Sequence, residues 1–296
     1  MFNTKHADHA RTYAYLKTMT RQRRYLLSVM IGCWAFLVPL ATGAEQLFDG
    51  HIHYNQDEWD VISPSNAIER LDRAGIGKAF VSSTPTEGTE KLYRLAPDRI
   101  IPVLRPYRSR ADRRTWFDDP ELLARLEANI DSVPYRGIGE FHIFGANAST
   151  PVVGEVLELA RQRGLFVHAH ADEDAITRIV DRAPDLTVVW AHAGFDVDVV
   201  RLGQMLDRYP NLLLELSFRN DIAPEGEITA AWRTILTRHP RRFLVGMDTY
   251  IASRWAELND LADEARHWLA QLPPDVAERI AIKNAAMLAD HTNAPQ

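Results

Sequence analysis

Short apolar runs recur eight times between residues 47 and 248, and stretches with the period of an amphipathic helix lie between them. Several runs are rich in Val, Ile, Leu and Phe and are apolar on both faces, which is typical of parallel strands covered by helices. Eight strand–helix units in about 250 residues match the size of a (β/α)8 TIM barrel. The predicted strands span residues 47–53, 78–82, 100–106, 137–143, 165–170, 187–192, 212–217 and 243–248.

Helix start and stop signals lie between these runs. Pro64 follows Ser63, as expected for a helix with a Ser N-cap and Pro at its first position. Residues 151–163 have a helical period and end before Gly164, a common helix C-cap residue. Further helices are predicted at residues 120–126, 198–208, 229–238 and 254–272, with a closing helix at 274–290.

A doubly wound open sheet is the rival α/β architecture. It usually has fewer strands and a G-x-G-x-x-G turn after the first strand, and no such turn follows residues 47–53 here. No internal repeat or low-complexity linker interrupts residues 45–296. We therefore expect a single barrel domain over residues 45–296.

Residues 1–44 have the composition of an N-terminal extension and signal peptide. Arg21, Arg23 and Arg24 precede an uncharged, largely apolar stretch over residues 25–44. Thr42 and Ala44 satisfy the small-residue rule for cleavage after Ala44. This predicts a secreted or periplasmic protein, and Met19 fits the start of such a signal better than Met1. The alternative is an uncleaved membrane anchor, although roughly 16 apolar residues is short of the about 20 that a span needs.

The charge and cysteine content restrict the partners and the ligands. Residues 45–296 carry 28 basic and 39 acidic side chains, which argues against nucleic acid as a partner and leaves room for a small anionic ligand. The only cysteine, Cys33, lies in the predicted signal, so a metal site in the mature chain must use His, Asp and Glu. We expect a small-molecule substrate and no stable membrane partner after signal removal, and the sequence leaves a homo-oligomer open.

Potential metal ligands cluster where the predicted strands end. Six of the nine histidines that follow the predicted signal lie there. Active sites of barrel enzymes form at the carboxyl ends of the strands, so these side chains are expected to meet. The residues are His51 and His53, Glu140 and His142, His168 and His170, His192, and Asp248.

The spacing of these residues favours a divalent cation. Alternation along a strand places His51 and His53 on the same face, and barrel closure brings the first strand beside the last, which ends at Asp248. Imidazole and carboxylate groups around one point suit Zn²⁺ or a similar ion.

This pattern resembles the amidohydrolase superfamily, most closely its amidohydrolase-related (amidohydrolase 2) branch. The likeness runs from LFDGHIHY (residues 47–54) to KNAAML (residues 283–288) in the closing helix. It implies a distorted barrel with one or two divalent metals. By motif, His51 and His53 match the first-strand ligands, His168 the fifth-strand ligand, His192 the sixth-strand histidine and Asp248 the last-strand aspartate.

Two features of the ligand set stay open. His168 and His170 share a strand face, and the family position directly after the apolar run favours His168 as the ligand, with His170 facing substrate. Glu140 stands where some family members place a glutamate that bridges two metals. With Glu140 the site holds two ions and without it one, and the mononuclear arrangement is the one the sequence favours.

The predicted activity is hydrolysis of a small ester, lactone or amide by a metal-activated water. Asp248 would bind the metal and accept the water proton, and His192 would stabilise the oxyanion or shuttle a proton. A metal-dependent decarboxylase of a small carboxylic acid is the alternative, followed by a non-catalytic binding barrel. The candidate substrate-binding residues are Arg105, His170, Arg219 and Tyr250, with Arg105 and Arg219 as a clamp for a carboxylate.

Overall fold

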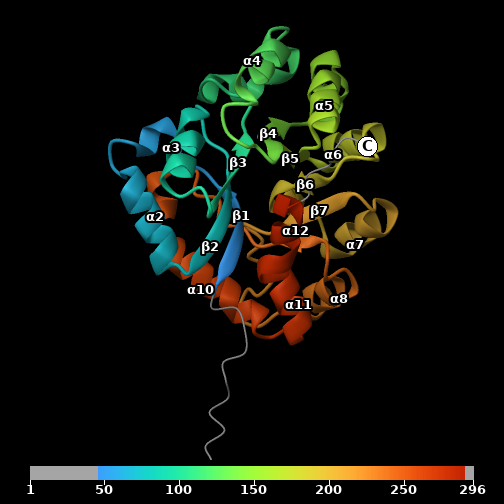
Figure 1. Ribbon diagram of the computed structural model, residues 1–296. Coiled ribbons are helices and arrows are strands. Elements are labelled where there is room, and N and C mark those ends of the chain that lie inside the picture. The colour runs from blue at the N-terminus through green and yellow to red at the C-terminus, as the bar shows by residue number, and fades with distance from the viewer. Residues whose placement is uncertain (1–45, 291–296) are drawn as a thin grey trace, which may run out of the picture. The chain divides into compact units, whose positions relative to one another are not determined.

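The computed structural model describes residues 46–290, and the predictions for residues 1–44 lie outside this range. Eight parallel strands follow one another in chain order, with helices around them (Figure 1). The (β/α)8 architecture predicted from the sequence is therefore confirmed. The strands are β1 (Leu47–Ile52), β2 (Ile76–Val81), β3 (Ile100–Leu104), β4 (Gly137–Ile143), β5 (Phe166–Ala171), β6 (Val188–Trp190), β7 (Leu212–Glu215) and β8 (Phe243–Leu244).

Hydrogen bonds between β1 and the segment that follows β8 bring the first and last strands together. The Gly50 amide donates to the Val245 carbonyl at 2.7 Å, and the Asp248 amide donates to the His51 carbonyl at the same distance. Strands β6 and β8 end earlier than predicted, at Trp190 and Leu244. Beyond these ends, His192 and Asp248 have left-handed backbone conformations, with φ of 57° and 47°. Both residues therefore lie in turns beyond the strand ends.

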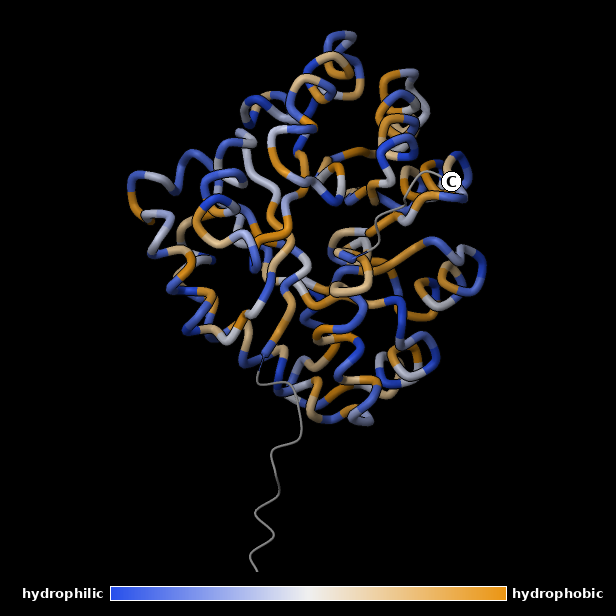
Figure 2. Tube along the Cα trace, in the orientation of Figure 1, coloured by the Kyte–Doolittle hydropathy of each residue, from blue (hydrophilic) through white to orange (hydrophobic). Residues whose placement is uncertain are grey.

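The helices surround the strands and turn their apolar sides inward (Figure 2). Two start signals read from the sequence act as expected: the Ser63 hydroxyl accepts a hydrogen bond from the Asn66 amide at 3.2 Å, and Gly164 ends its helix with φ of 64°. The predicted helix over 254–272 is two helices that meet at Glu257. The helices are α2 (Pro64–Arg73), α3 (Glu87–Leu95), α4 (Leu122–Asn129), α5 (Pro151–Arg163), α6 (Glu173–Arg182), α7 (Val199–Arg208), α8 (Ala230–Arg238), α9 (Ala252–Ala256), α10 (Leu258–Leu269), α11 (Pro274–Glu278) and α12 (Asn284–Asp290), with a π-helical turn at Arg279–Lys283.

An apolar layer fills the amino-terminal end of the barrel, where Ala285 and Ala289 of α12 pack against it. On β2, β3 and β5 the residues two positions further on, Ser82, Arg105 and His168, lie above this layer, as alternation along a strand predicts. On β1 the pairing register shifts between Asp49 and Ile52, so that His51 and His53 face the site although they lie three and five residues beyond Phe48. The apolar layer consists of Phe48, Phe80, Val103, Phe166, Val189 and Leu244.

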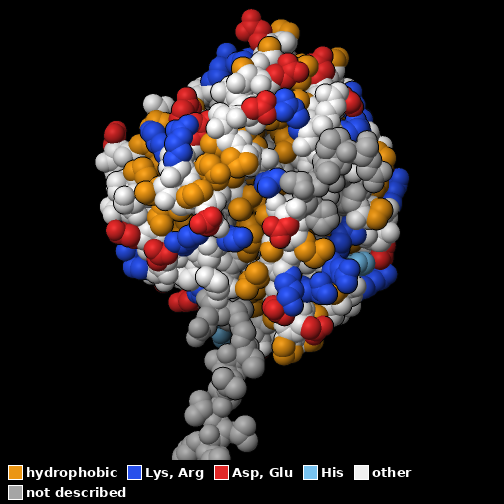
Figure 3. Space-filling view, viewed as in Figure 1, with side chains coloured by type: hydrophobic (Ala, Val, Ile, Leu, Met, Phe, Trp, Pro, Cys, Tyr) orange, Lys and Arg blue, Asp and Glu red, His pale blue; other side chains and the backbone are white. Residues whose placement is uncertain are grey.

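The face of the molecule seen in Figure 3 carries basic and acidic side chains interspersed with apolar ones. Within residues 46–290, no helix has the length and apolar character needed to cross a membrane.

Candidate metal centre

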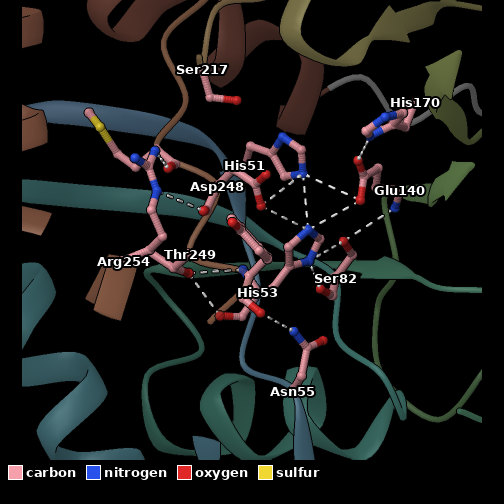
Figure 4. Close-up of polar contacts among 12 residues, drawn as sticks. His51, His53, Asn55, Ser82, Glu140, His170, Ser217, Asp248, Thr249 and Arg254 are labelled. Carbon is pink, nitrogen blue, oxygen red and sulfur yellow. Dashed lines mark hydrogen bonds and ion pairs between the residues drawn. The ribbon is translucent and has the colours of Figure 1, made fainter. Parts of the chain in front are cut away.

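His51 and His53 lie at the end of β1 and are both almost completely buried. Their Nε2 atoms are 3.0 Å apart and point toward a common region that Glu140 and Asp248 also face (Figure 4). The prediction that the two imidazoles share one face of the first strand is therefore confirmed.

In three of the histidines, the Nδ1 atom contacts an oxygen atom on the side of the ring that faces away from this region. Nδ1 of His51 lies 2.9 Å from Glu215 Oε2, and Nδ1 of His53 lies against the Ser82 carbonyl. Nδ1 of His192 lies 2.7 Å from the Ser217 hydroxyl. An Nδ1–H donated to these acceptors leaves the Nε2 lone pair free, the arrangement typical of imidazoles that bind a metal.

Two carboxylates face the Nε2 atoms of the β1 histidines. Oε2 of Glu140 lies 3.2 Å from Nε2 of His53 and 3.7 Å from Nε2 of His51. Oδ1 of Asp248 lies 3.3 Å and 3.8 Å from the same two atoms. Oδ1 is buried and has no hydrogen-bond partner within residues 46–290. A buried carboxylate oxygen left without a donor, facing two imidazole lone pairs, fits a cation held between them.

The second oxygen of Glu140 faces another pair of histidines. Oε1 lies 2.9 Å from Nδ1 of His170 on β5 and 3.6 Å from Nε2 of His192 after β6. The two oxygens of one carboxylate thus face two separate groups of nitrogen atoms. This is the geometry expected of a carboxylate that bridges two cations.

His168 lies deeper in the barrel than His170. Its ring centroid is 4.6 Å from that of His51, and its potential ligand atom groups with those of His51 and Glu215 rather than with Glu140. Along β5, Phe166 belongs to the apolar layer, so His168 is in the next layer and His170 in the outermost one. The structure therefore brings His170 to Glu140 and His168, the ligand favoured by the sequence, to His51 and Glu215.

Glu215 on β7 belongs to the candidate site, although the sequence did not point to it. It is fully buried, and besides His51 it accepts hydrogen bonds from the His192 amide at 3.1 Å and the Ser217 hydroxyl at 3.0 Å. Its partner strand leaves room for it at Gly246, where a Cβ atom would lie 2.0 Å from Glu215 Oε1. The available signal was its position two residues before Ser217, on the same face of an otherwise apolar strand.

Two arginines hold the turns that present Asp248 and His192. Arg254 donates to the Met247 carbonyl at 2.6 Å and to the Asp248 carbonyl at 3.4 Å. Arg219 donates through Nη1 to the Ala193 carbonyl at 3.0 Å. Left-handed backbone costs roughly 1–2 kcal/mol per non-glycine residue, so these contacts offset part of the strain in the two turns.

A cavity of about 450 Å³ opens over the cluster, and some of the predicted substrate-binding residues line it. His170 and Tyr250 line it, and so does Arg105, but the Arg105 guanidinium is bound to Glu140, with Nη2 2.7 Å from Oε2. Arg219 is not among its lining residues and pairs with Asp221 at 2.8 Å. The structure thus does not bring Arg105 and Arg219 together as the expected carboxylate clamp.

The buried charges shift the pKa values of the cluster. Burial alone would lower the pKa of His51, but Asp248, Glu215 and Glu140 together raise it well above its usual value. Burial, and then the charge of Arg105, lower the pKa of His53. Burial opposes ionisation of Glu215, yet His51 and His192 hold its pKa below the usual range. Without a cation, the site therefore favours an ionised Glu215 and a proton on His51.

Solved structures share this fold. An uncharacterised TIM-barrel protein from Bordetella bronchiseptica is 17% identical, with 82% of this chain and 98% of that chain covered and a TM-score of 0.58. A phosphotriesterase homology protein from Escherichia coli, solved with phosphate in its active site, is 11% identical over 83% of this chain and 98% of that chain, with a TM-score of 0.55. These likenesses show the fold alone.

A third similar structure is a Pseudomonas putida protein provisionally assigned as a 2-pyrone-4,6-dicarboxylic acid hydrolase, 14% identical over 83% of this chain and 98% of that chain, with a TM-score of 0.58. No curated protein sequence matches this chain. The family profile described as Amidohydrolase (Amidohydro_2) matches residues 49–288, from the β1 motif to α12. This chain therefore belongs to the Amidohydrolase family and is an enzyme of that family.

Proposed function

We propose that this enzyme is a metal-dependent hydrolase whose site holds two divalent cations. The observation that carries the proposal is the position of Glu140, whose oxygens face His53 on one side and His170 on the other. His51, His53 and Asp248 would hold one cation, His170 and His192 the other, and Glu140 both. This differs from the mononuclear site favoured by the sequence, because the sequence does not reveal that both Glu140 oxygens have imidazole neighbours.

The donor set supports Zn²⁺ or a similar ion. Imidazole nitrogen and carboxylate oxygen are the ligands that Zn²⁺ accepts in proteins without cysteine. The outer contacts that Glu215, Ser82 and Ser217 make to the three histidines fix the ring orientations that such an ion requires.

A divalent cation bound at these residues lowers the pKa of a water molecule toward about 7 and polarises a substrate carbonyl. Asp248 would accept the proton of the attacking water through its unpaired oxygen and then return it to the leaving group. His192 would act as a ligand rather than as an oxyanion partner, because its Nε2 faces Glu140 and Asp248 at 3.6 and 3.9 Å. Arg105 would hold the Glu140 carboxylate in place from the side opposite His170.

Chelation followed by reconstitution tests this proposal. Purified protein is stripped with a chelator, reloaded with single divalent metals, and assayed on matched esters, lactones and amides. We expect activity only after reloading and a new carboxylate as product. Release of CO₂ would instead establish the decarboxylase alternative, and activity that survives complete metal removal would overturn metal dependence.

We further propose that the mature enzyme begins near residue 45, after export across the inner membrane. The basic and apolar segments of residues 1–44 support this. Intact-mass analysis of protein from the periplasmic fraction would give the chain start after Ala44. A full-length mass in the membrane fraction would support an uncleaved anchor instead.

A further inference from the structure

The cavity over the candidate metal centre has one aromatic wall. Phe195, Phe218 and Tyr250 form a row, with ring centroids 6.0 Å apart for the first pair and 6.2 Å for the second. Phe195 and Tyr250 are 38% and 42% exposed, so their apolar faces are open to a ligand. A planar apolar group of a substrate can pack against this row.

Three arginines line the same cavity, and two of them are already paired. Arg105 is bound to Glu140, and Arg110 pairs with Asp57 at 2.8 Å. The Arg113 side chain is exposed, and within residues 46–290 it has no hydrogen bond and no carboxylate at ion-pair distance. The cavity therefore contains one guanidinium whose charge no side chain compensates.

Tyr107 and His142 line the cavity together with Arg113. The Tyr107 hydroxyl accepts a hydrogen bond from the His142 amide at 2.6 Å and lies 3.2 Å from Nδ1 of the half-buried His142 ring, so these two groups are engaged with each other. A guanidinium in such a position binds a carboxylate through two parallel hydrogen bonds.

We propose that Arg113 binds a carboxylate of the substrate, at a distance from the bond that is cleaved, while a planar apolar part of the substrate packs on the aromatic row. This rests on the proposed hydrolytic function and names the class of its substrate: a small, anionic, aromatic or similarly planar ester, lactone or amide. Arg113 is then a specificity-determining residue rather than a catalytic one.

A matched pair of esters tests the proposal in the metal-loaded enzyme. The esters are 4-carboxyphenyl acetate and its neutral amide analogue 4-carbamoylphenyl acetate. We expect kcat/KM to favour the anionic ester by about tenfold or more, which corresponds to about 1.4 kcal/mol. R113Q should lower kcat/KM for the anionic ester to the value for the neutral ester, so that the preference is lost. R114Q is the matched control, since Arg114 is an exposed neighbour on the same 3-10 helix (Arg110–Arg114) that does not line the cavity.

Binding measured without turnover separates this proposal from the proposed function. Calorimetric titration with benzene-1,4-dicarboxylate and with 4-carbamoylbenzoate compares ligands that differ only in the remote carboxylate. Tighter binding of the dicarboxylate by wild type and R114Q, lost in R113Q, supports the proposal even if neither ester is hydrolysed. Equal or undetectable binding of both ligands, or a preference that R113Q retains, overturns it.

Discussion

Nδ1 of His170 lies 2.9 Å from Oε1 of Glu140. His168, two residues earlier on β5, has a buried Nε2 with no hydrogen-bond partner within residues 46–290 and lies against the His51 ring. The two histidines therefore lie in different layers of the barrel, and only the outer one reaches the carboxylate that links the two groups of nitrogen atoms.

Replacing each of these two histidines by asparagine tests which of them binds a cation. H170N should lose about one cation per chain and at least about 100-fold in kcat, because it removes a proposed ligand. H168N should retain both cations, since its side chain lies below the site. Elemental analysis of the purified variants, with circular dichroism as a folding control, measures the outcome. Metal loss in H168N but not in H170N would instead support His168 as the ligand, as the sequence favours.

Asp248→Asn tests the role of the unpaired carboxylate oxygen. The amide keeps an oxygen that a cation can bind but cannot accept a proton from the attacking water. We expect kcat to fall by about 10²–10⁴-fold with most of the metal retained. D260N, an exposed substitution on α10, is the control. Activity close to that of wild type in D248N would exclude Asp248 as the general base.

Glu215→Gln tests the buried support beneath the β1 histidines. The Glu215 carboxylate accepts hydrogen bonds from donors that include His51 Nδ1 and the Ser217 hydroxyl. In the variant, the NH₂ group of the glutamine amide is itself a donor and cannot accept these hydrogen bonds. We expect metal affinity to fall by about 10–100-fold, the usual cost of removing such an outer contact. Competition with a chromophoric chelator measures the affinity. A folded variant with unchanged affinity would show that Glu215 does not orient His51.

The raised pKa of His51 predicts how metal binding depends on pH. Because its pKa in the folded, metal-free protein lies well above 6.5, the protonated imidazole contributes stability below pH 6.5 that is lost as pH rises through the folded pKa. A cation must displace this proton, so metal affinity should increase with pH above 6.5 until the folded pKa is passed. Calorimetry at pH 7 in two buffers of different ionisation enthalpy should reveal proton release. Equal apparent enthalpies in both buffers would contradict this.

The sequence predicted the barrel because each strand carries its own apolar run and the helices carry their own caps, as at Ser63 and Gly164. These signals are local. The convergence of His51, His53 and Asp248 was also predictable, since strand alternation and barrel closure determine it. Helices α3 and α6 were not identified individually.

The remaining features of the site depend on contacts between strands. A periodicity of two places His168 and His170 on the same face of the strand, so the sequence does not distinguish them. The layer that each histidine occupies in the barrel decides which one reaches Glu140. Arg105 and Arg219 were expected to face substrate, but a buried guanidinium needs acceptors, and Glu140 and the Ala193 carbonyl supply them. The role of Glu215 in the candidate site could not be predicted from the sequence, because its partners come from β1 and from the turn after β6.

Anomalous diffraction from crystals of the metal-loaded enzyme tests the two-cation centre most directly. Data collected on both sides of the absorption edge of the bound metal would locate each ion. We predict two anomalous peaks, one among His51, His53 and Asp248 and one beside His170 and His192, with Glu140 between them. A single peak with Glu140 unattached, or no peak near these side chains in a fully loaded protein, would contradict the account.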